Sequence, residues 1–527
     1  MNKKNRHLKS LSHINKLVAL YYDKEYRCPS VVNLLKIPRF HYIIFIIFLF
    51  LLTNYTFAES YRDYRLDDLN YLSKGRKTIQ NEGRIETSAK SKNTDKDSAT
   101  EDSDTKFIYN SFLTSKFYSQ KGGDKEDLAR RYATQLNFTP EFVGYKRSGS
   151  SRFMVLASPI ISHRENFQLK RSVNRLVDTE AILAWKLDKS DFSINLEGGR
   201  GYRRLDAYGL FFNGMANYFE SNFFWKPFGI KFSLIALSYN YKQENFTIRS
   251  TLTNDKMFGG NLLFTSIPFI SHLQIFNYLI LEPGQLAEKE FFQEDKRFKP
   301  KGRFLYSGLE SKTQQFYKGL DLEFAFFSVT GYRDYAEYWY QHFNTISKTN
   351  AFLSYLALNW NLDKYDFRIG GLYSTKDKSN SFNRANNGYS SLVSDVRIFG
   401  GKSSFLLMEN VNEKNGAIFR DFDSTNENRY DTKGIQLASL GMNYKVAPMF
   451  QLTGIINHVN SNLGIGNEGI LSGMFHNSGS FSGFLTASVC LARVNPITQK
   501  KVIFDELRVD PSIKEFLRFY VSAGLTF

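Results

Sequence analysis

The feature that most constrains this chain is a two-residue period of apolar side chains, which dominates the sequence beyond about residue 150. In residues 192–198, apolar or small residues alternate with Ser193, Asn195 and Glu197, and similar alternation runs through 246–252 and 365–373. Successive side chains of a strand point to opposite faces of a sheet, so this period predicts strands with one apolar face. The chain is therefore expected to be all-β.

Strands of this kind fit a transmembrane antiparallel β-barrel, in which apolar side chains face lipid and polar ones face the lumen. The chain also uses aromatic rings in bulk, with 49 Phe and 31 Tyr among 527 residues. A mean hydropathy of -0.37 excludes a polytopic helical membrane protein, because each helical span needs about 20 consecutive apolar residues.

The connections between the expected strands are of two kinds. Segments 185–192 (WKLDKSDF) and 360–367 (WNLDKYDF) match at six positions. We interpret both as tight turns at one end of the barrel, with Trp185 and Trp360 at the membrane interface, although a gene-level duplication is the alternative. Long polar connections are expected at about 200–216, 240–243, 282–302, 331–350, 376–388, 409–432, 460–480 and 495–515. This alternation predicts about 16 strands, within a range of 14–18.

The region before the barrel divides into two parts. Residues 1–58 contain an 11-residue apolar run, YIIFIIFLFLL, that ends near the small residue Ala58. This favours a signal peptide with an extended basic n-region over an uncleaved anchor, and a translation start near Val31 is also open. Residues 59–150 are expected to form a mostly disordered periplasmic tail with a possible short helix at 124–135, and residues 151–527 to form the barrel. We interpret 144–152 as a linker.

The last strand carries the most specific signal in the chain. Its alternating apolar residues are Leu517, Phe519, Val521, Ala523, Leu525 and Phe527. It resembles the closing strand of Gram-negative outer-membrane β-barrels, whose terminal aromatic residue is read by the barrel-assembly machinery. The resemblance implies that Phe527 is this assembly signal.

A finer resemblance concerns function. Segments such as LAWKLDKSDFSINLEGG and YKGLDLEFAFFSV are similar to channels of the alginate-export type. The resemblance implies a porin-like channel in the bacterial outer membrane, with membrane lipid, the assembly machinery and small solutes as partners. It assigns no binding residue and leaves the oligomeric state open.

Charge suggests which solutes pass. The net charge of +17 falls when the basic leader is removed, and export makes nucleic acid an improbable partner. A basic cluster between 294 and 303 would favour anions if it folded into the channel mouth. The candidate pore-lining or mouth residues are Lys231, Arg249, Arg368, Arg518, Lys296, Arg297, Lys299, Lys301 and Arg303. The segment 198–204 (GGRGYRR) is a secondary candidate.

Other chemistry has little support. The histidines have no metal-ligand spacing, and Gly400 to Ser403 (GGKS) lacks the spacing of a phosphate loop and is interpreted as a turn. We therefore expect no enzyme, cofactor or metal site. The leading function is a passive or weakly selective channel for small hydrophilic, anionic solutes, and the alternative is a surface barrel of adhesin or receptor type whose long loops bind a partner.

Overall fold

A computed structural model describes residues 105–121, 132–166, 171–239, 255–285, 299–316, 319–334, 346–376, 385–389, 391–392, 398–400, 404, 406, 434–461, 464–477, 482–496 and 515–526. The expected leader 1–58 and the tail residues 59–104 lie outside this part. No helix among the described residues has both the length and the hydropathy needed to cross a membrane.

The described residues form almost entirely strands. Their bounds are β1 Thr105–Lys121, β2 Tyr132–Ser148, β3 Ser151–Asn166, β4 Arg171–Asp188, β5 Phe192–Arg204, β6 Asn213–Trp225, β7 Ile230–Tyr239, β8 Asp255–Phe264, β9 Ile270–Gln285, β10 Lys299–Thr313, β11 Leu320–Asp334, β12 Ile346–Asn361, β13 Tyr365–Ser374, β14 Ala385–Asn386, β15 Ile435–Ala447, β16 Phe450–Ser461, β17 Gly464–Asn477, β18 Ser482–Pro496 and β19 Glu515–Thr526. A single 3-10 turn, Lys226–Phe228, connects β6 to β7.

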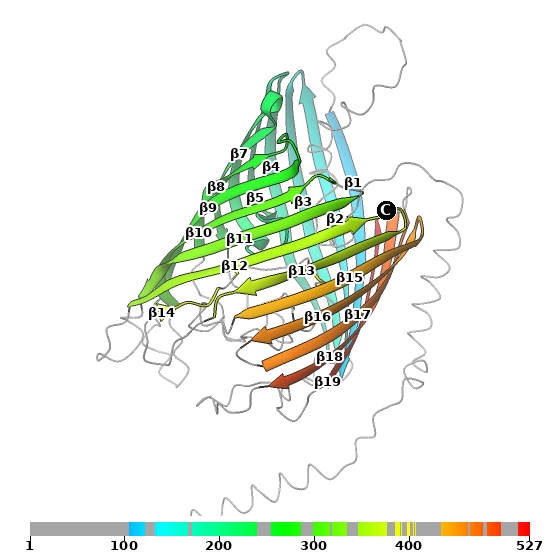
Figure 1. The fold of residues 1–527 in the computed structure, drawn as a ribbon. Coiled ribbons are helices and arrows are strands. Elements are labelled where there is room, and N and C mark those ends of the chain that lie inside the picture. Colours follow the sequence, from blue (N-terminus) through cyan, green and yellow to red (C-terminus); the bar gives the residue numbers. More distant parts are fainter. Residues whose placement is uncertain are drawn as a thin grey trace, which may run out of the picture. The chain divides into compact units, whose positions relative to one another are not determined.

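The strands close into an antiparallel barrel (Figure 1). Closure comes from β1, which pairs with β2 on one side and with β19 on the other, from Phe112↔Thr526 to Lys121↔Leu517. β14 is a two-residue strand that pairs with β12 in parallel, and β13 pairs directly with β15. The other eighteen strands make the wall, so the predicted barrel is confirmed and the expected number of about 16 strands is corrected to 18.

The expected start of the barrel at residue 151 is wrong, because β1 and β2 lie within 59–150. β2 contains Pro140, and proline cannot donate a hydrogen bond to a sheet ladder. The structure accommodates it where pairing between β2 and β3 is interrupted, between Phe138↔Ile161 and Phe142↔Ala157. The expected helix at 124–135 is contradicted where it is described, because 132–135 belong to β2. The supposed linker 144–152 is the β2–β3 hairpin.

The two kinds of connection lie at opposite ends of the barrel, as expected. Both predicted tight turns are confirmed: Lys189 N donates to Phe192 O at 2.9 Å, and Leu362 N donates to Tyr365 O at 2.7 Å. The expected loop at 460–480 is wrong, because 464–477 form β17. Its glycines and polar residues resemble a loop in sequence, but pairing with β16 and β18 supplies a ladder on both edges.

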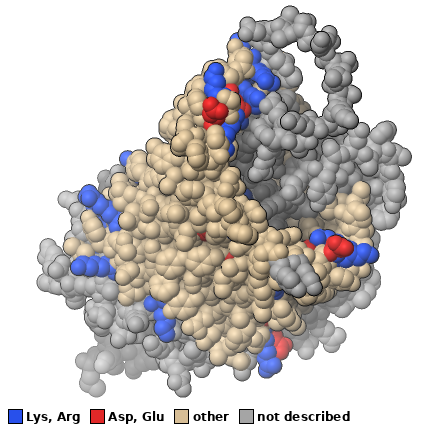
Figure 2. Space-filling model, turned by 45° about the horizontal axis from the view of Figure 1, so that its top comes forward, with Lys and Arg blue, Asp and Glu red and all other residues tan. Residues whose placement is uncertain are grey.

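The outer face of the barrel is apolar. Among the side chains that project outward are Leu183, Phe219, Leu234, Phe258, Leu356, Ile369, Leu440, Ile456, Leu471 and Leu491, all exposed. Figure 2 shows a broad uncharged wall with Lys and Arg gathered toward its margins. Near the short turns lie Trp225 and Trp360, each more than 40% exposed. A closed barrel with this surface is an outer-membrane protein, because only lipid covers such a wall without cost.

The inner face is polar, with buried aromatic residues. In β19, Arg518 is 4% exposed, whereas its neighbours Leu517 and Phe519 are 44% and 41% exposed. The predicted outward direction of Phe519 is thus confirmed, and Phe192 also lies on the outer face, where its ring stacks on Phe223. Phe246 and Ile248, assigned to the same face, lie outside the described residues.

Because the outer face is apolar, the loss of stability caused by a charged side chain on β12 should depend on its depth in the membrane. Leu356→Arg places a cation in the middle of the apolar band and should lower the free energy of unfolding by about 2–4 kcal/mol. Ile346→Arg, at the end of the same face of the same strand, should cost about 0–1 kcal/mol. Denaturant titration in lipid vesicles compares the two variants, and equal costs would contradict the assigned membrane band.

Candidate functional site

Two segments, which we call the constriction segments, lie inside the barrel against its inner face. The first is residues 205–212, which join β5 to β6 and fold against the inner wall. Asp206 organises this turn: its carboxylate accepts the N–H of Leu210 at 2.6 Å and those of Phe211 and Phe212 at 3.0 Å each. One side chain thereby satisfies three backbone donors that the tight turn leaves unpaired.

Aromatic packing holds the first constriction segment in place. The Phe211 ring stacks on Phe276 and Tyr278 of β9, with centroids 5.1 and 5.5 Å apart, and contacts Tyr306 of β10 at 5.1 Å. Phe211 itself is fully buried. Such aromatic contacts add about 0.5–1.5 kcal/mol each to the free energy of burial. The segment is also tied to the wall by Glu310, which accepts the N–H of Ala207 at 2.9 Å.

The second constriction segment comprises residues 389, 391–392, 398–400, 404 and 406, which lie between β14 and β15. Its first part pairs with the first segment: Leu392 N donates to Phe211 O at 3.0 Å, and the Ser391 hydroxyl donates to Leu210 O at 2.7 Å. The Tyr389 hydroxyl also donates to Leu210 O. The two segments therefore form one bridge inside the barrel.

The far part of the second segment is fastened to β16–β19. Glu468 of β17, 3% exposed, accepts hydrogen bonds from Ser404 and from Asn457. Asn457 also donates to Phe399 O at 3.1 Å, and Arg518 donates to Ser404 O at 3.4 Å. The contacts of the two segments thus extend along the inner face of the barrel from β9 and β10 to β16, β17 and β19, and both segments occupy space inside the lumen.

A left-handed turn shapes the middle of the second segment. Phe399 has φ 47° and Gly400 has φ 89°, a conformation that glycine adopts freely and phenylalanine rarely. A Cβ added at Gly400 would lie 2.4 Å from Ile470 Cδ1, so the turn also needs glycine for space. The turn predicted at Gly400 is confirmed, and Gly401 to Ser403 lie outside the described residues.

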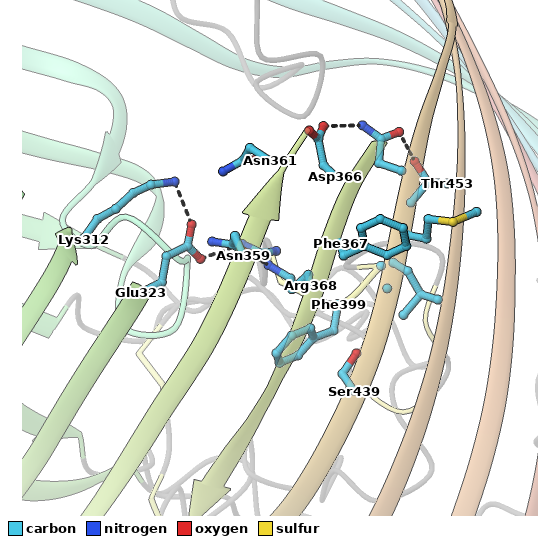
Figure 3. Close-up of a pocket in the computed structure, with 15 residues that line it drawn as sticks. Lys312, Glu323, Asn359, Asn361, Asp366, Phe367, Arg368, Phe399, Ser439 and Thr453 are labelled. Atoms are coloured by element: carbon cyan, nitrogen blue, oxygen red, sulfur yellow. Dashed lines mark hydrogen bonds and ion pairs between the residues drawn. The ribbon is translucent and has the colours of Figure 1, made fainter. Parts of the chain in front are cut away.

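Beside this turn, the inner wall of β10–β13, β15 and β16 forms a pocket of about 290 Å³. The labelled residues in Figure 3 surround it, with the Phe399 ring on one side. Its lining residues are Lys312, Glu323, Asn359, Asn361, Asp366, Phe367, Arg368, Phe399, Gly400, Ser439, Gly441, Met442, Asn443, Thr453 and Ile455.

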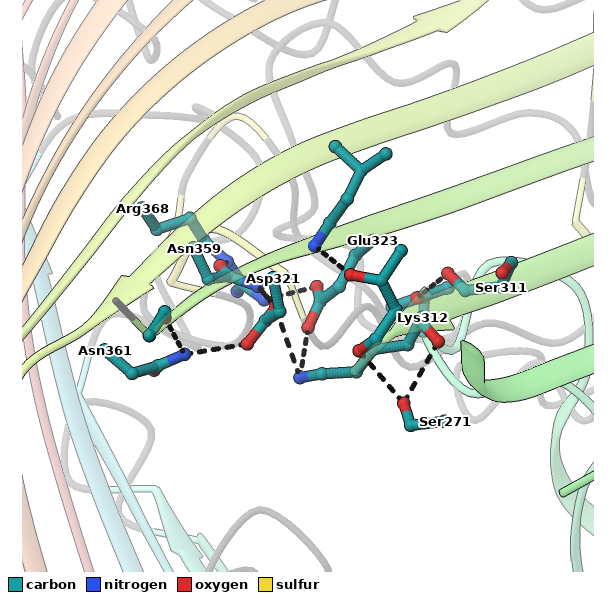
Figure 4. Close-up of polar contacts among 12 residues, drawn as sticks. Ser271, Ser311, Lys312, Asp321, Glu323, Asn359, Asn361 and Arg368 are labelled. Atoms are coloured by element: carbon teal, nitrogen blue, oxygen red, sulfur yellow. Dashed lines mark hydrogen bonds and ion pairs between the residues drawn. The ribbon is translucent and has the colours of Figure 1, made fainter. Parts of the chain in front are cut away.

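A polar network supports one wall of the pocket (Figure 4). Arg368 Nη2 contacts Glu323 at 2.5 Å and its Nε donates to Asn359 at 2.8 Å. Lys312 contacts the same glutamate at 3.0 Å, and Asn359 donates to Asp321 at 2.7 Å. Because each charge has an opposite partner, the wall remains rigid without a bound solute.

The residues that the sequence predicts to line the pore or its mouth do not form one cluster. Lys231, Arg368 and Arg518 lie on lumen-facing positions of β7, β13 and β19, and the network and the bridge bring only Arg368 and Arg518 into the sites described above. Arg249, Lys296, Arg297 and Phe527 lie outside the described residues. Lys299 opens β10 and pairs with Gln285.

The expectation that Lys301 and Arg303 line the mouth is corrected. Both are exposed, whereas their neighbours Gly302 and Phe304 are buried. Alternation along β10 therefore directs both cations to the outer surface. They were predicted in a loop, but β10 begins at Lys299 and already fixes the direction of each side chain.

The secondary candidate 198–204 contributes one lumenal cation. Arg203 contacts Glu197 at 2.6 Å and Glu220 at 3.2 Å, and its guanidinium lies 3.6 Å from the Tyr218 ring centroid. Sequence reasoning missed the constriction segments altogether. The available signal was the apolar run Leu210 to Phe212 inside an expected polar loop, since an exposed loop does not need three consecutive large apolar residues.

Comparison with known proteins adds little to this geometry. No protein-family model and no curated protein matches the sequence. Solved structures with a similar arrangement include the Pseudomonas aeruginosa proteins OprD (TM-score 0.47, 9% identity, 80% of this chain and 95% of that one) and OccK5 (0.46, 9%, 80% and 98%). The P. aeruginosa protein OpdK with vanillate has a TM-score of 0.45 and 11% identity over 80% of this chain and 99% of that one. At such values the fold assignment rests on the strand pairing itself.

Asp206 predicts a pH dependence of the constriction. Burial and then the neighbouring Glu310 carboxylate raise the pKa of Asp206 from 3.8 to about 6, against three N–H bonds that lower it. Asp206 therefore binds a proton more tightly when the first constriction segment is packed against the wall than when it is detached. The packed state becomes more stable as the pH falls through about 6 toward 3.8, and this added stability disappears as the pH rises again. The Glu310 carboxylate also contacts His272 Nε2 at 3.1 Å.

We expect the conductance of the barrel to fall between about pH 7 and pH 4, because protonation favours the seated segment. Asp206→Asn should remove this change. Asp363→Asn, in the exposed β12–β13 turn, is the control and should retain it. Planar-bilayer recordings at a series of pH values test the prediction, and an unchanged profile in Asp206→Asn would assign the titration to another group.

Proposed function

We propose that this protein is an outer-membrane channel for small hydrophilic solutes, narrowed by the two constriction segments. The observation that carries the proposal is the pair of hydrogen-bonded segments inside the barrel, held by Asp206 in the first and by Glu468 against the second. A channel that selects solutes by size needs a segment inside the barrel that narrows the pore beside a polar wall. A barrel that only displays binding loops has no need of it.

The charge of the wall argues against the anion preference expected from the basic cluster. Among the described residues, the buried carboxylates are Glu141, Glu180, Glu197, Asp206, Asp255, Glu282, Glu310, Asp321, Glu323 and Glu468, and the buried guanidiniums are Arg152, Arg203, Arg333 and Arg518. We infer a weak preference for cations, because carboxylate rings favour them. Lys301 and Arg303, on the outer surface, are suited to contact anionic lipid head groups instead.

The preference can be measured as a reversal potential in a salt gradient. A cation-selective sign is expected, and it should weaken as the salt concentration rises because exposed charges are screened over about 8 Å at physiological ionic strength. Converting Lys301 and Arg303 to Gln should leave the potential unchanged. If the reversal potential of that variant were more cation-selective than that of the natural chain, Lys301 and Arg303 would have to lie in the pore.

Conductance tests the channel itself. Phe211→Ala combined with Phe212→Ala removes the rings that seat the first constriction segment, so the conductance should increase, on the order of two-fold, as the lumen widens. Phe269→Ala, at the exposed β8–β9 turn, removes a ring that is 78% exposed and should change nothing.

A refolded chain without conductance would reject the channel and favour the alternative, a surface barrel whose long loops bind a partner. Equal conductance in the natural chain and in the double variant would contradict the constriction. The readout is single-channel current in planar bilayers.

A further inference from the structure

The pocket described above carries no net charge. The cations around it are Lys312, Arg368 and Lys445, and the carboxylates are Asp321, Glu323 and Asp366. Every cation lies within 3.1 Å of a carboxylate. A charged solute would have to displace one of these partners, so the wall discriminates against anions and cations alike.

Several polar groups nevertheless have no partner among the described residues. The Ser439 hydroxyl is buried and makes no hydrogen bond. Arg368 uses its Nε and Nη2 atoms, which leaves Nη1, and Asn361 uses only Nδ2, which leaves its carbonyl oxygen. A buried polar atom without a partner costs about 1–3 kcal/mol, so the Ser439 hydroxyl gains most from a bound partner, whereas the Arg368 and Asn361 atoms are not fully buried.

The unused groups mix donors with acceptors. Arg368 Nη1 can only donate, the Asn361 oxygen can only accept, and the Ser439 hydroxyl can do both. A hydroxyl group also does both, so a molecule with several hydroxyls matches this set, whereas a carboxylate matches only the donors. Figure 3 shows the Ser439 side chain on the β15 wall beneath the Phe399 ring.

The apolar part of the pocket fits the same kind of molecule. The Phe399 ring covers one side, with the Arg368 guanidinium 5.8 Å from its centroid, and Ile455 lines the wall nearby. Pockets for small molecules combine apolar surface with a few directed polar groups and begin at about 300 Å³. The present volume of about 290 Å³ suits one compact solute.

We propose that this pocket is a binding subsite for an uncharged polyhydroxylated solute of monosaccharide size. The proposal rests on the channel function above and names the class of solute that the channel retains in transit. Ser439 and Arg368 Nη1 bind hydroxyl groups, and Phe399 contacts the carbon face.

Three probes that share one carbon skeleton test the proposal: glucose, which is neutral, gluconate, which is anionic, and glucosamine, which is cationic. Each is titrated against the ion current of the full chain in a planar bilayer. Glucose should interrupt the current at the lowest concentration. Ser439→Ala should raise the half-blocking concentration of glucose about 5- to 10-fold, which corresponds to one lost hydrogen bond.

Two further variants support the comparison. Phe399→Ala removes the ring that contacts the carbon face, so it should weaken glucose block in the same way, and it keeps the proposal testable if Ser439→Ala fails to assemble. Ser472→Ala is the matched control, because Ser472 bonds Ser488 at 2.8 Å on β17 and β18, outside the pocket. It should leave glucose block unchanged.

The outcomes separate the subsite from the channel. Stronger block by gluconate, reduced by Ser439→Ala, would make the pocket an anion site and overturn the proposal. Glucose block that is equal in the natural chain and in both pocket variants would also overturn it. A chain that conducts but responds to none of the probes would reject the subsite and leave the channel, whereas absence of conductance would reject the channel on which it rests.

Discussion

The pairing of β1 with β19 is the interaction on which the rest of the structure depends. In hydrocarbon each unpaired backbone N–H or C=O costs several kcal/mol, so a sheet in a membrane must close on itself. Here closure joins the first and the last strand of the barrel, from Phe112↔Thr526 to Lys121↔Leu517. Once the sheet is closed, alternation along each strand divides the side chains into a lipid face and a lumenal face, and the whole interior becomes available for polar groups.

The inner wall of the barrel also holds the two constriction segments in place. The inner wall offers rings such as Phe276 and Tyr306 to bury Phe211, and buried carboxylates such as Asp206 and Glu468 to bind backbone and side-chain donors. Aromatic packing provides most of the burial, and the carboxylates fix where each segment lies. The pocket is a consequence, because the Phe399 turn leaves space between the bridge and the wall.

Charges illustrate why position in a strand matters more than composition. Arg368 and Arg303 are both arginines in strands of this barrel, yet Arg368 contacts Glu323 in the lumen and Arg303 lies on the outer surface. The difference is one of register, since a shift of one residue moves a side chain to the other face. Clear alternation surrounds Arg368, so the sequence indicates the face on which it lies. The face of Arg303 could not be inferred in this way, because the start of β10 is polar and its limits could not be identified from residue types.

The sequence by itself determined the all-β class, the closing strand with Leu517 and Phe519 outward, and the tight turns after Trp185 and Trp360, because period and turn chemistry are local properties. It did not reveal β1, β2 and β17, whose polar, proline or glycine content becomes tolerable only when neighbouring strands supply the ladder. Only the tertiary structure decided that residues 205–212 turn inward and meet a segment almost 180 residues later. That choice depends on rings and carboxylates from distant strands, which meet only after the barrel has closed.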